Sequence, residues 1–115
     1  MSEYKIKTDN HGNKYYYIND KLHREDGPAI EYANGTKEWH KNGKLHRSDG
    51  PALTTFLGTK YWYKNNKLHR EDGPAIEYIS GIKEWYQYGK LHRNDGPAIE
   101  NGPAIERWDG KKAGI

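Results

Sequence analysis

The chain has 115 residues, of which 33% are hydrophobic and 30% charged, and its formal net charge is +3. This length accommodates one domain, and so low a hydrophobic content is unusual for a closed globular core. The sequence contains no cysteine, which excludes a disulfide framework and a thiolate metal site. No segment approaches the roughly 20 apolar residues of a membrane-spanning helix or forms the apolar run of a signal peptide. We therefore expect a soluble, cytoplasmic protein with no membrane partner.

Disorder is the main alternative for so polar a chain. Ten tyrosines and four tryptophans recur at regular positions, whereas disordered segments are poor in aromatic residues. The charge is well mixed, with 19 basic and 16 acidic residues, so the small positive surplus is only a weak argument for nucleic-acid binding. The composition therefore favours a folded chain with little core of its own.

A 23-residue tandem repeat organises the sequence. Every copy contains the motif His-Arg-x-Asp-Gly-Pro-Ala, and an aromatic residue recurs with the same period. A period of 20 to 50 residues is typical of repeat proteins, in which each unit buries its apolar face against its neighbours. We predict one repeat domain over residues 1–115. It comprises a partial N-terminal unit (1–20), three complete repeats (21–43, 44–66 and 67–89) and an irregular C-terminal unit (90–115).

In chain order, residues 14–18 are rich in aromatic and β-branched side chains and predict a strand. Residues 28–32 begin with a proline, which suits the start of a strand, and then alternate between apolar and polar residues. Asn34-Gly35 predicts a tight hairpin turn, residues 36–40 the return strand, and Asn42-Gly43 a further turn. The later repeats follow the same order. The predicted fold is all-β: an open, single-layer antiparallel sheet of stacked β-hairpin repeats.

We expect a narrow apolar seam along this sheet, because equivalent residues of successive units lie two strands, or roughly 9.5 Å, apart. The seam joins the periodic tyrosine and tryptophans to aliphatic residues of the same period, namely Ile30, Leu53, Ile76, Ile99, Leu22, Leu45, Leu68 and Leu91. In the last unit, Gly-Pro-Ala-Ile-Glu occurs at 96–100 and again at 102–106. Either Trp108 continues the tryptophan series or a collapsed unit begins there. In both interpretations the last strand is an edge or a cap, and an open edge could pair with a second copy to form a homodimer.

The recurring histidine and aspartate could suggest a general base with an orienting carboxylate. An active site needs one such pair, whereas this chain has four at equal spacing: His23, Asp26, His46, Asp49, His69, Asp72, His92 and Asp95. We expect a structural role, in which the aspartate caps the Gly-Pro turn while histidine and arginine donate to it or to the neighbouring unit. Histidines roughly 9.5 Å apart cannot share a metal ion. We predict no metal, no cofactor and no enzymatic activity.

The run Glu-Trp-His-Lys-Asn-Gly-Lys-Leu-His-Arg at 38–47, followed by Asp49-Gly50 and another strand, resembles the MORN repeat. That family also combines an aromatic strand, an Asn-Gly-Lys turn and a nearby histidine. The resemblance covers nearly all of residues 12–100, although the chain lacks the Tyr-x-Gly opening and carries Arg-x-Asp-Gly-Pro-Ala in place of a Gly-rich loop. The chain is most similar to the divergent MORN-variant repeats of phages, large DNA viruses and bacterial antitoxin-like proteins. The resemblance implies a non-catalytic scaffold whose sheet engages proteins or lipids.

Residues that depart from the repeat are the main candidates for contact with a partner. Where the first hairpin tip has Ala33-Asn34, the second has Phe56-Leu57 and the third Ile79-Ser80. Aromatic anchors are enriched in binding hot spots. The predicted partner-binding patch is Phe56, Leu57, Ile79, Ile82, Tyr61, Tyr63, Tyr86 and Tyr88. By the resemblance, we expect a protein partner and action by occlusion, as in a phage or viral inhibitor of a host defence protein or an antitoxin-like neutraliser.

A row of lysines beside the aromatic series is the alternative site: Lys14, Lys37, Lys60, Lys83, Trp39, Trp62 and Trp85. Basic residues interleaved with aromatic rings suit a phosphate backbone with stacked bases, so nucleic acid or a ribonucleoprotein is the alternative partner. In the structural interpretation, the lysine stems cover the aromatic seam and the ammonium groups pair with glutamates. We favour the structural interpretation, because glutamates offset these charges: Glu31, Glu38, Glu77, Glu84 and Glu100.

Overall fold

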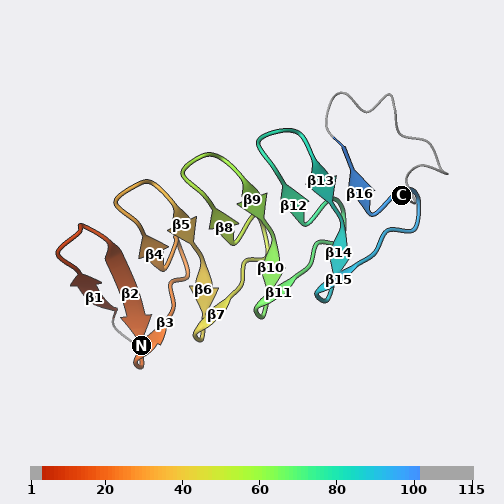
Figure 1. Ribbon diagram of the computed structural model, residues 1–115. Coiled ribbons are helices and arrows are strands. Elements are labelled where there is room, and N and C mark those ends of the chain that lie inside the picture. The colour runs from red at the N-terminus through yellow and green to blue at the C-terminus, as the bar shows by residue number, and fades with distance from the viewer. Residues whose placement is uncertain (1–3, 102–115) are drawn as a thin grey trace.

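The computed structural model describes residues 4–101. This part of the chain is all-β, contains no helix and forms an open, elongated array with extents of 52 × 26 × 18 Å (Figure 1). The predicted architecture, an open antiparallel sheet built from repeated hairpins, is therefore confirmed. The alternatives for the unit after Glu100, including the place of Trp108, concern residues outside the described range.

One long antiparallel sheet runs through all the units. Its strand order is β1-β2-β4-β5-β8-β9-β12-β13-β16, and β3 (Lys21–Leu22) pairs with β2 beside this path. The strands are β1 (Lys5–Thr8), β2 (Lys14–Ile18), β4 (Ile30–Glu31), β5 (Lys37–Glu38), β8 (Leu53–Thr54), β9 (Lys60–Tyr61), β12 (Ile76–Glu77), β13 (Lys83–Glu84) and β16 (Ile99–Glu100). The strands of the sheet follow one another in chain order, with β3 or a smaller hairpin inserted after every second strand.

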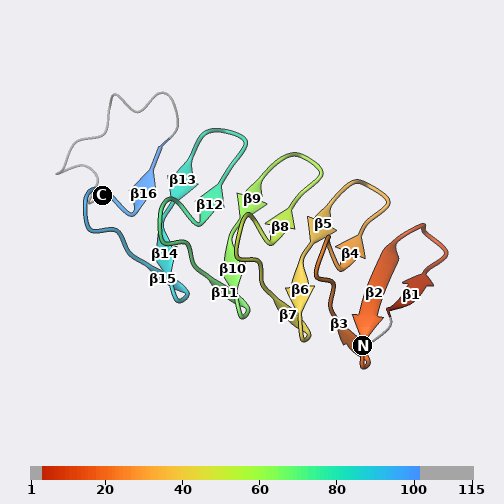
Figure 2. The same ribbon diagram turned by 180° about the vertical axis from the view of Figure 1, so that it is seen from behind.

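A second, smaller hairpin joins the end of each complete repeat to the start of the next unit. These hairpins pair β6 (His40–Lys41) with β7 (Lys44–Leu45), β10 (Tyr63–Lys64) with β11 (Lys67–Leu68), and β14 (Tyr86–Gln87) with β15 (Lys90–Leu91). Figures 1 and 2 show the loops of the long sheet projecting along one side of the array and the small hairpins along the other.

The prediction of one continuous return strand at 36–40 is wrong. It divides at Trp39 into β5, which belongs to the long sheet, and β6, which belongs to a small hairpin. Trp39 N donates to Ala52 O at 2.6 Å, whereas the next residue, His40, pairs with Leu45. The chain therefore changes its pairing partner at the tryptophan.

The two kinds of turn differ in backbone geometry. In the small hairpin, Asn42 and Gly43 both have positive φ, 51° and 84°, as a two-residue type I′ turn requires. In the tip of the long sheet only Gly35 has positive φ, at 98°, and Tyr32 N donates to Thr36 O across a longer loop. Asn34-Gly35 therefore marks a hairpin, as predicted, but one with three residues in its loop.

The core differs in part from the predicted seam. The alanines of the Gly-Pro-Ala motif, Ala29, Ala52 and Ala75, are fully buried, and Ile30 and Ile76 nearly so. Leu91 and Ile99, which the seam included, are exposed.

Candidate functional site

The guanidinium group of each motif arginine lies over the ring of the periodic tyrosine or tryptophan that precedes the motif. The guanidinium carbons of Arg24, Arg47, Arg70 and Arg93 are 3.6–3.9 Å from the ring centres of Tyr16, Trp39, Trp62 and Trp85. Each Nη1 also donates to the carbonyl oxygen of the motif proline at 3.0–3.2 Å. This cation–π layer covers one face of every ring in the series.

The histidine of each of the first three motifs accepts a hydrogen bond from the turn at the end of its own repeat. His23 Nδ1 accepts a hydrogen bond from the backbone N–H of Asn42 at 3.0 Å, and the same bond recurs from Asn65 to His46 and from Tyr88 to His69. The expected histidine–aspartate contact is not formed, because Nε2 faces a glutamate instead, as in the 2.7 Å pair of His23 with Glu25. The aspartate pairs with the arginine, at 3.1–3.4 Å.

The second motif differs, because Ser48 stands where the first and third have Glu25 and Glu71. His46 therefore has no glutamate at the position that pairs with Nε2 in the other two motifs. Burial, followed by the nearby charges of Lys41 and Lys64, lowers the pKa of the His46 imidazole below its ordinary value.

The predicted lysine row lies on one face of the long sheet and alternates with glutamates across the strands. In register order, with each residue opposite the next, the row reads Lys14, Glu31, Lys37, Thr54, Lys60, Glu77, Lys83 and Glu100. Directly opposed side chains of antiparallel strands lie within interaction distance, so opposite charges here stabilise the sheet. The row is balanced except at Thr54.

This arrangement argues against the lysine row as a nucleic-acid platform. Glutamates separate most of the lysines, so a chain of phosphates would meet repulsion at every second step. The tryptophan rings are half-buried, and a guanidinium already lies on each of them. Stacking of bases needs free aromatic faces, which the arginines occupy on that side.

The opposite face carries tyrosines bonded to glutamates. Tyr32 donates to Glu38 at 3.0 Å and Tyr86 to Glu84 at 2.9 Å. Burial and the adjacent carboxylate raise the pKa of both phenols to about 12, so both remain neutral donors. The hydrogen bond from His40 lowers the pKa of Glu38, which keeps that carboxylate ionised. These contacts tie Tyr32 and Tyr86 to carboxylates of the same chain.

The eight residues of the predicted partner-binding patch do not lie together. Phe56, Leu57 and Ile79 are on adjacent hairpin tips and are 59%, 62% and 70% exposed. Ile82 follows its tip and is half-buried, as are Tyr61 and Tyr63, whose rings stack at 6.4 Å, and Tyr86. Tyr88 is exposed in the β14–β15 turn, where its ring lies 4.3 Å from that of His69, along the opposite side of the array (Figure 1).

The tips form a continuous apolar ridge, defined by Phe56, Leu57 and Ile79. A methyl group placed on Gly58 would lie 3.0 Å from Ile79 Cδ1, and one on Gly35 would lie 3.8 Å from Phe56 Cβ. Phe56 N also donates to Thr36 Oγ1 at 3.0 Å. Each tip therefore rests on the preceding one, and these large side chains remain in solvent without a partner from the described part of the chain.

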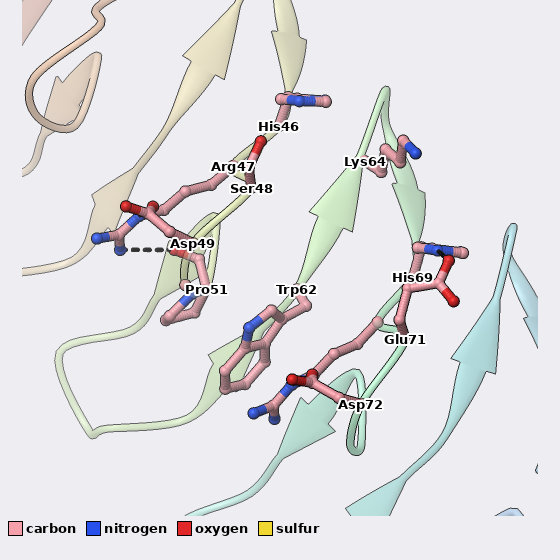
Figure 3. A pocket seen from close by; sticks show the side chains of 12 residues that line it. His46, Arg47, Ser48, Asp49, Pro51, Trp62, Lys64, His69, Glu71 and Asp72 are labelled. Atoms are coloured by element: carbon pink, nitrogen blue, oxygen red, sulfur yellow. Dashed lines mark hydrogen bonds and ion pairs between the residues drawn. The ribbon is translucent and has the colours of Figure 1, made fainter.

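Grooves separate successive motif loops. The larger, of about 650 Å³, lies between the loops of the second and third motifs, with Trp62 and Lys64 rising between them (Figure 3). Its wall carries Ser48 on one side and the His69–Glu71 pair on the other. Within residues 4–101 there is no cluster of three or more His, Asp or Glu side chains that could hold a metal ion.

Two features of the site were not predicted from the sequence. The arginines, which we expect to donate to the aspartate or to the neighbouring unit, also cover the aromatic rings. Thr54 was not singled out, although it replaces a glutamate of the other units and interrupts the charged row. Departure from the repeat is the sequence signal for Phe56 and Leu57. The same signal marks Thr54, because a charged residue of the repeat is replaced there by an uncharged one.

No protein-family model matches this chain, and no curated protein or solved structure is significantly similar to it. Among the described residues, no helix has the length and apolarity needed to cross a lipid bilayer.

Proposed function

We propose that this repeat array is a non-catalytic scaffold that binds another protein through the apolar ridge of its hairpin tips. The observation that carries the proposal is the exposure of Phe56, Leu57 and Ile79 on adjacent tips. Large apolar side chains gathered on a surface mark interaction sites, and phenylalanine is among the residues enriched in protein–protein interfaces.

The rest of the architecture supports a binding role. The motif residues recur in successive units and are engaged in contacts within and between units, whereas the tips differ from one unit to the next. A rigid framework with variable loops is the arrangement in which proteins commonly place recognition residues. The resemblance to MORN-variant repeats suggests a phage or viral inhibitor, or an antitoxin-like neutraliser, that occludes its target in the cytoplasm.

Nucleic acid remains the alternative partner, and ionic strength separates the two. Phosphate binding weakens steeply with salt, whereas apolar contacts do not. Partner capture that persists at 0.5 M salt supports a protein bound through the ridge.

The test is a double substitution at the tip that carries two exposed apolar side chains, Phe56→Ser with Leu57→Asn. We expect the tagged variant to lose the partner that the parent chain captures from a lysate of the native host, because removing two apolar anchors costs roughly 2 to 4 kcal/mol of binding. Mass spectrometry of the captured proteins measures this loss.

Ile6→Asn is the matched control, since Ile6 is similarly exposed but lies on β1, away from the ridge. Circular dichroism checks that both variants keep the fold. Equal capture by the parent chain and the folded tip variant would refute the ridge as the binding site.

A further inference from the structure

Thr54 occupies a position where every other described unit has a glutamate. Glu31, Glu77 and Glu100 each accept a hydrogen bond from the motif arginine, at 3.2, 3.0 and 3.2 Å. In the sheet, Glu31 and Glu77 also lie between two lysines. Each of these carboxylates is therefore surrounded by three cations, two from neighbouring strands and one from the motif.

The three cations persist around Thr54, but the carboxylate does not. Lys37 and Lys60 lie directly opposite Thr54 on its two neighbouring strands. Arg47 keeps the position of the other motif arginines, because its Nη1 still donates to Pro51 O at 3.1 Å and its guanidinium still lies on Trp39. Its remaining carboxylate partner is Asp49, whose side chain is 86% exposed. At Thr54 the array therefore has the three positive side chains but not the carboxylate that lies among them in the other units.

The geometry points to a carboxylate of the protein partner as the ligand of this site: we infer that an aspartate or glutamate side chain binds over Thr54, between Lys37, Lys60 and Arg47. The fold builds the same site twice more, at Glu31 and Glu77, and fills it with a glutamate, so its surroundings suit a carboxylate. Arginine and lysine donors around a carboxylate form charge-assisted hydrogen bonds, which are stronger than neutral ones.

The surroundings favour one acidic side chain over a polyanion. Glu31 and Glu77 flank the site one lysine away on either side along the row, so a second and third phosphate would meet negative charge. The site also adjoins the ridge, since Thr54 is two residues from Phe56. The complementary segment is therefore an acidic residue next to an apolar one. This inference rests on the proposed function for the identity of the partner, but the anion site itself can be tested without it.

The test uses the full chain, labelled with ¹⁵N, and two probes: an acetylated tetraglutamate amide and a hexathymidylate. We expect the peptide to shift the amide resonances of Lys37, Thr54 and Lys60 in an NMR titration at low salt. Thr54→Glu supplies the internal carboxylate of the other units and is expected to weaken peptide binding about fivefold. It introduces a residue that the same fold holds elsewhere.

Glu77→Thr is the matched gain-of-site variant, because it should create a second cluster from Lys60, Lys83 and Arg70. Peptide shifts that survive in Thr54→Glu, or that fail to appear near residue 77 in Glu77→Thr, would overturn the inference. Preferential binding of hexathymidylate would overturn the choice of a carboxylate. If both variants behave as expected while the tip variant still captures its partner, the anion site is supported and the ridge is refuted as the binding site. If the tip variant loses its partner while Thr54→Glu and Glu77→Thr do not behave as expected, the anion site alone is refuted.

Discussion

At the scale of single residues, the second repeat lacks two negative charges that the first and third repeats carry. Ser48 and Thr54 stand where those repeats have the glutamates that pair with the histidine and the arginine. Neither replacement disturbs the backbone, since His46 still accepts a bond from the turn that ends its repeat and Arg47 still lies on Trp39. The framework contacts and the charge balance of a unit are therefore separable.

A pH prediction follows for His46. Its pKa in the folded chain is lowered by burial and by Lys41 and Lys64, so the folded state favours neutral imidazole more than the unfolded state does. The associated stability is present above the unfolded pKa of roughly 6.5 and is lost as the pH falls through the folded value.

We expect Ser48→Glu to raise the pKa of His46 by supplying the carboxylate that faces His23 and His69. The variant should then retain about 0.5 kcal/mol more stability than the parent when the pH falls from 7.5 to 5.5. Urea unfolding at both pH values and an NMR titration of the His46 ring measure the two effects. The other histidines are common to both proteins, so an unchanged His46 titration would contradict the assignment.

At the scale of the repeat element, the motif arginine joins the motif loop to the preceding aromatic ring and to the long sheet. Arg70 lies on Trp62, donates to Pro74 O at 3.0 Å and pairs with Glu77 at 3.0 Å and Asp72 at 3.4 Å. Such a planar, multidentate role cannot be taken over by the point charge of a lysine. The arginine therefore couples the motif loop to the long sheet.

We expect Arg70→Lys to cost about 2 kcal/mol of unfolding free energy, through loss of the stacked guanidinium and its bonds to Pro74 and Glu77. Arg47→Lys is the internal comparison, because Arg47 makes the same contacts except the one to a glutamate on the sheet. Its cost should be smaller by about 1 kcal/mol. Urea unfolding followed by tryptophan fluorescence measures both, and equal costs would show that the glutamate pair contributes nothing.

Much of this element was predictable from sequence. The period, the two turns of each unit and the antiparallel sheet follow from glycine, asparagine and proline positions, whose backbone preferences are local. The break at Trp39 was not, because it depends on which strand each side of the tryptophan pairs with. The burial of Ala75 and the exposure of Leu91 were likewise not predictable, since burial depends on which residues far apart in the chain the fold brings together.

At the scale of the whole molecule, the array is held together by contacts between nearest neighbours. Successive units are joined by the long sheet, by the small hairpins, and by backbone bonds such as Trp39 N to Ala52 O at 2.6 Å. The stability of such an array is approximately a sum over units and their interfaces. No unit needs a contact with a distant one.

Deletion of residues 44–66 should therefore leave a folded chain. The deletion joins Gly43 to Lys67 and restores the Gly-Lys-Leu-His sequence of the repeat. We expect a retained β circular dichroism spectrum and a urea m-value lower by about a fifth, because m scales with the surface exposed on unfolding. Deletion of residues 44–55 is the control, since it removes β7 and β8 but leaves their hairpin partners β6 and β9. Equal loss of structure in both deletion variants would contradict a modular array.

The hairpin tips have one further consequence. Their backbones close in the same way in three units, through bonds from residue 32 to 36, 55 to 59 and 78 to 82. The side chains at 33–34, 56–57 and 79–80 are all exposed, and two of them, Asn34 and Ser80, accept a hydrogen bond from the backbone of their own tip, at Thr36 and Ile82. Evolution can consequently exchange the other four amino acids, and with them the choice of target, without re-optimising the framework that carries them.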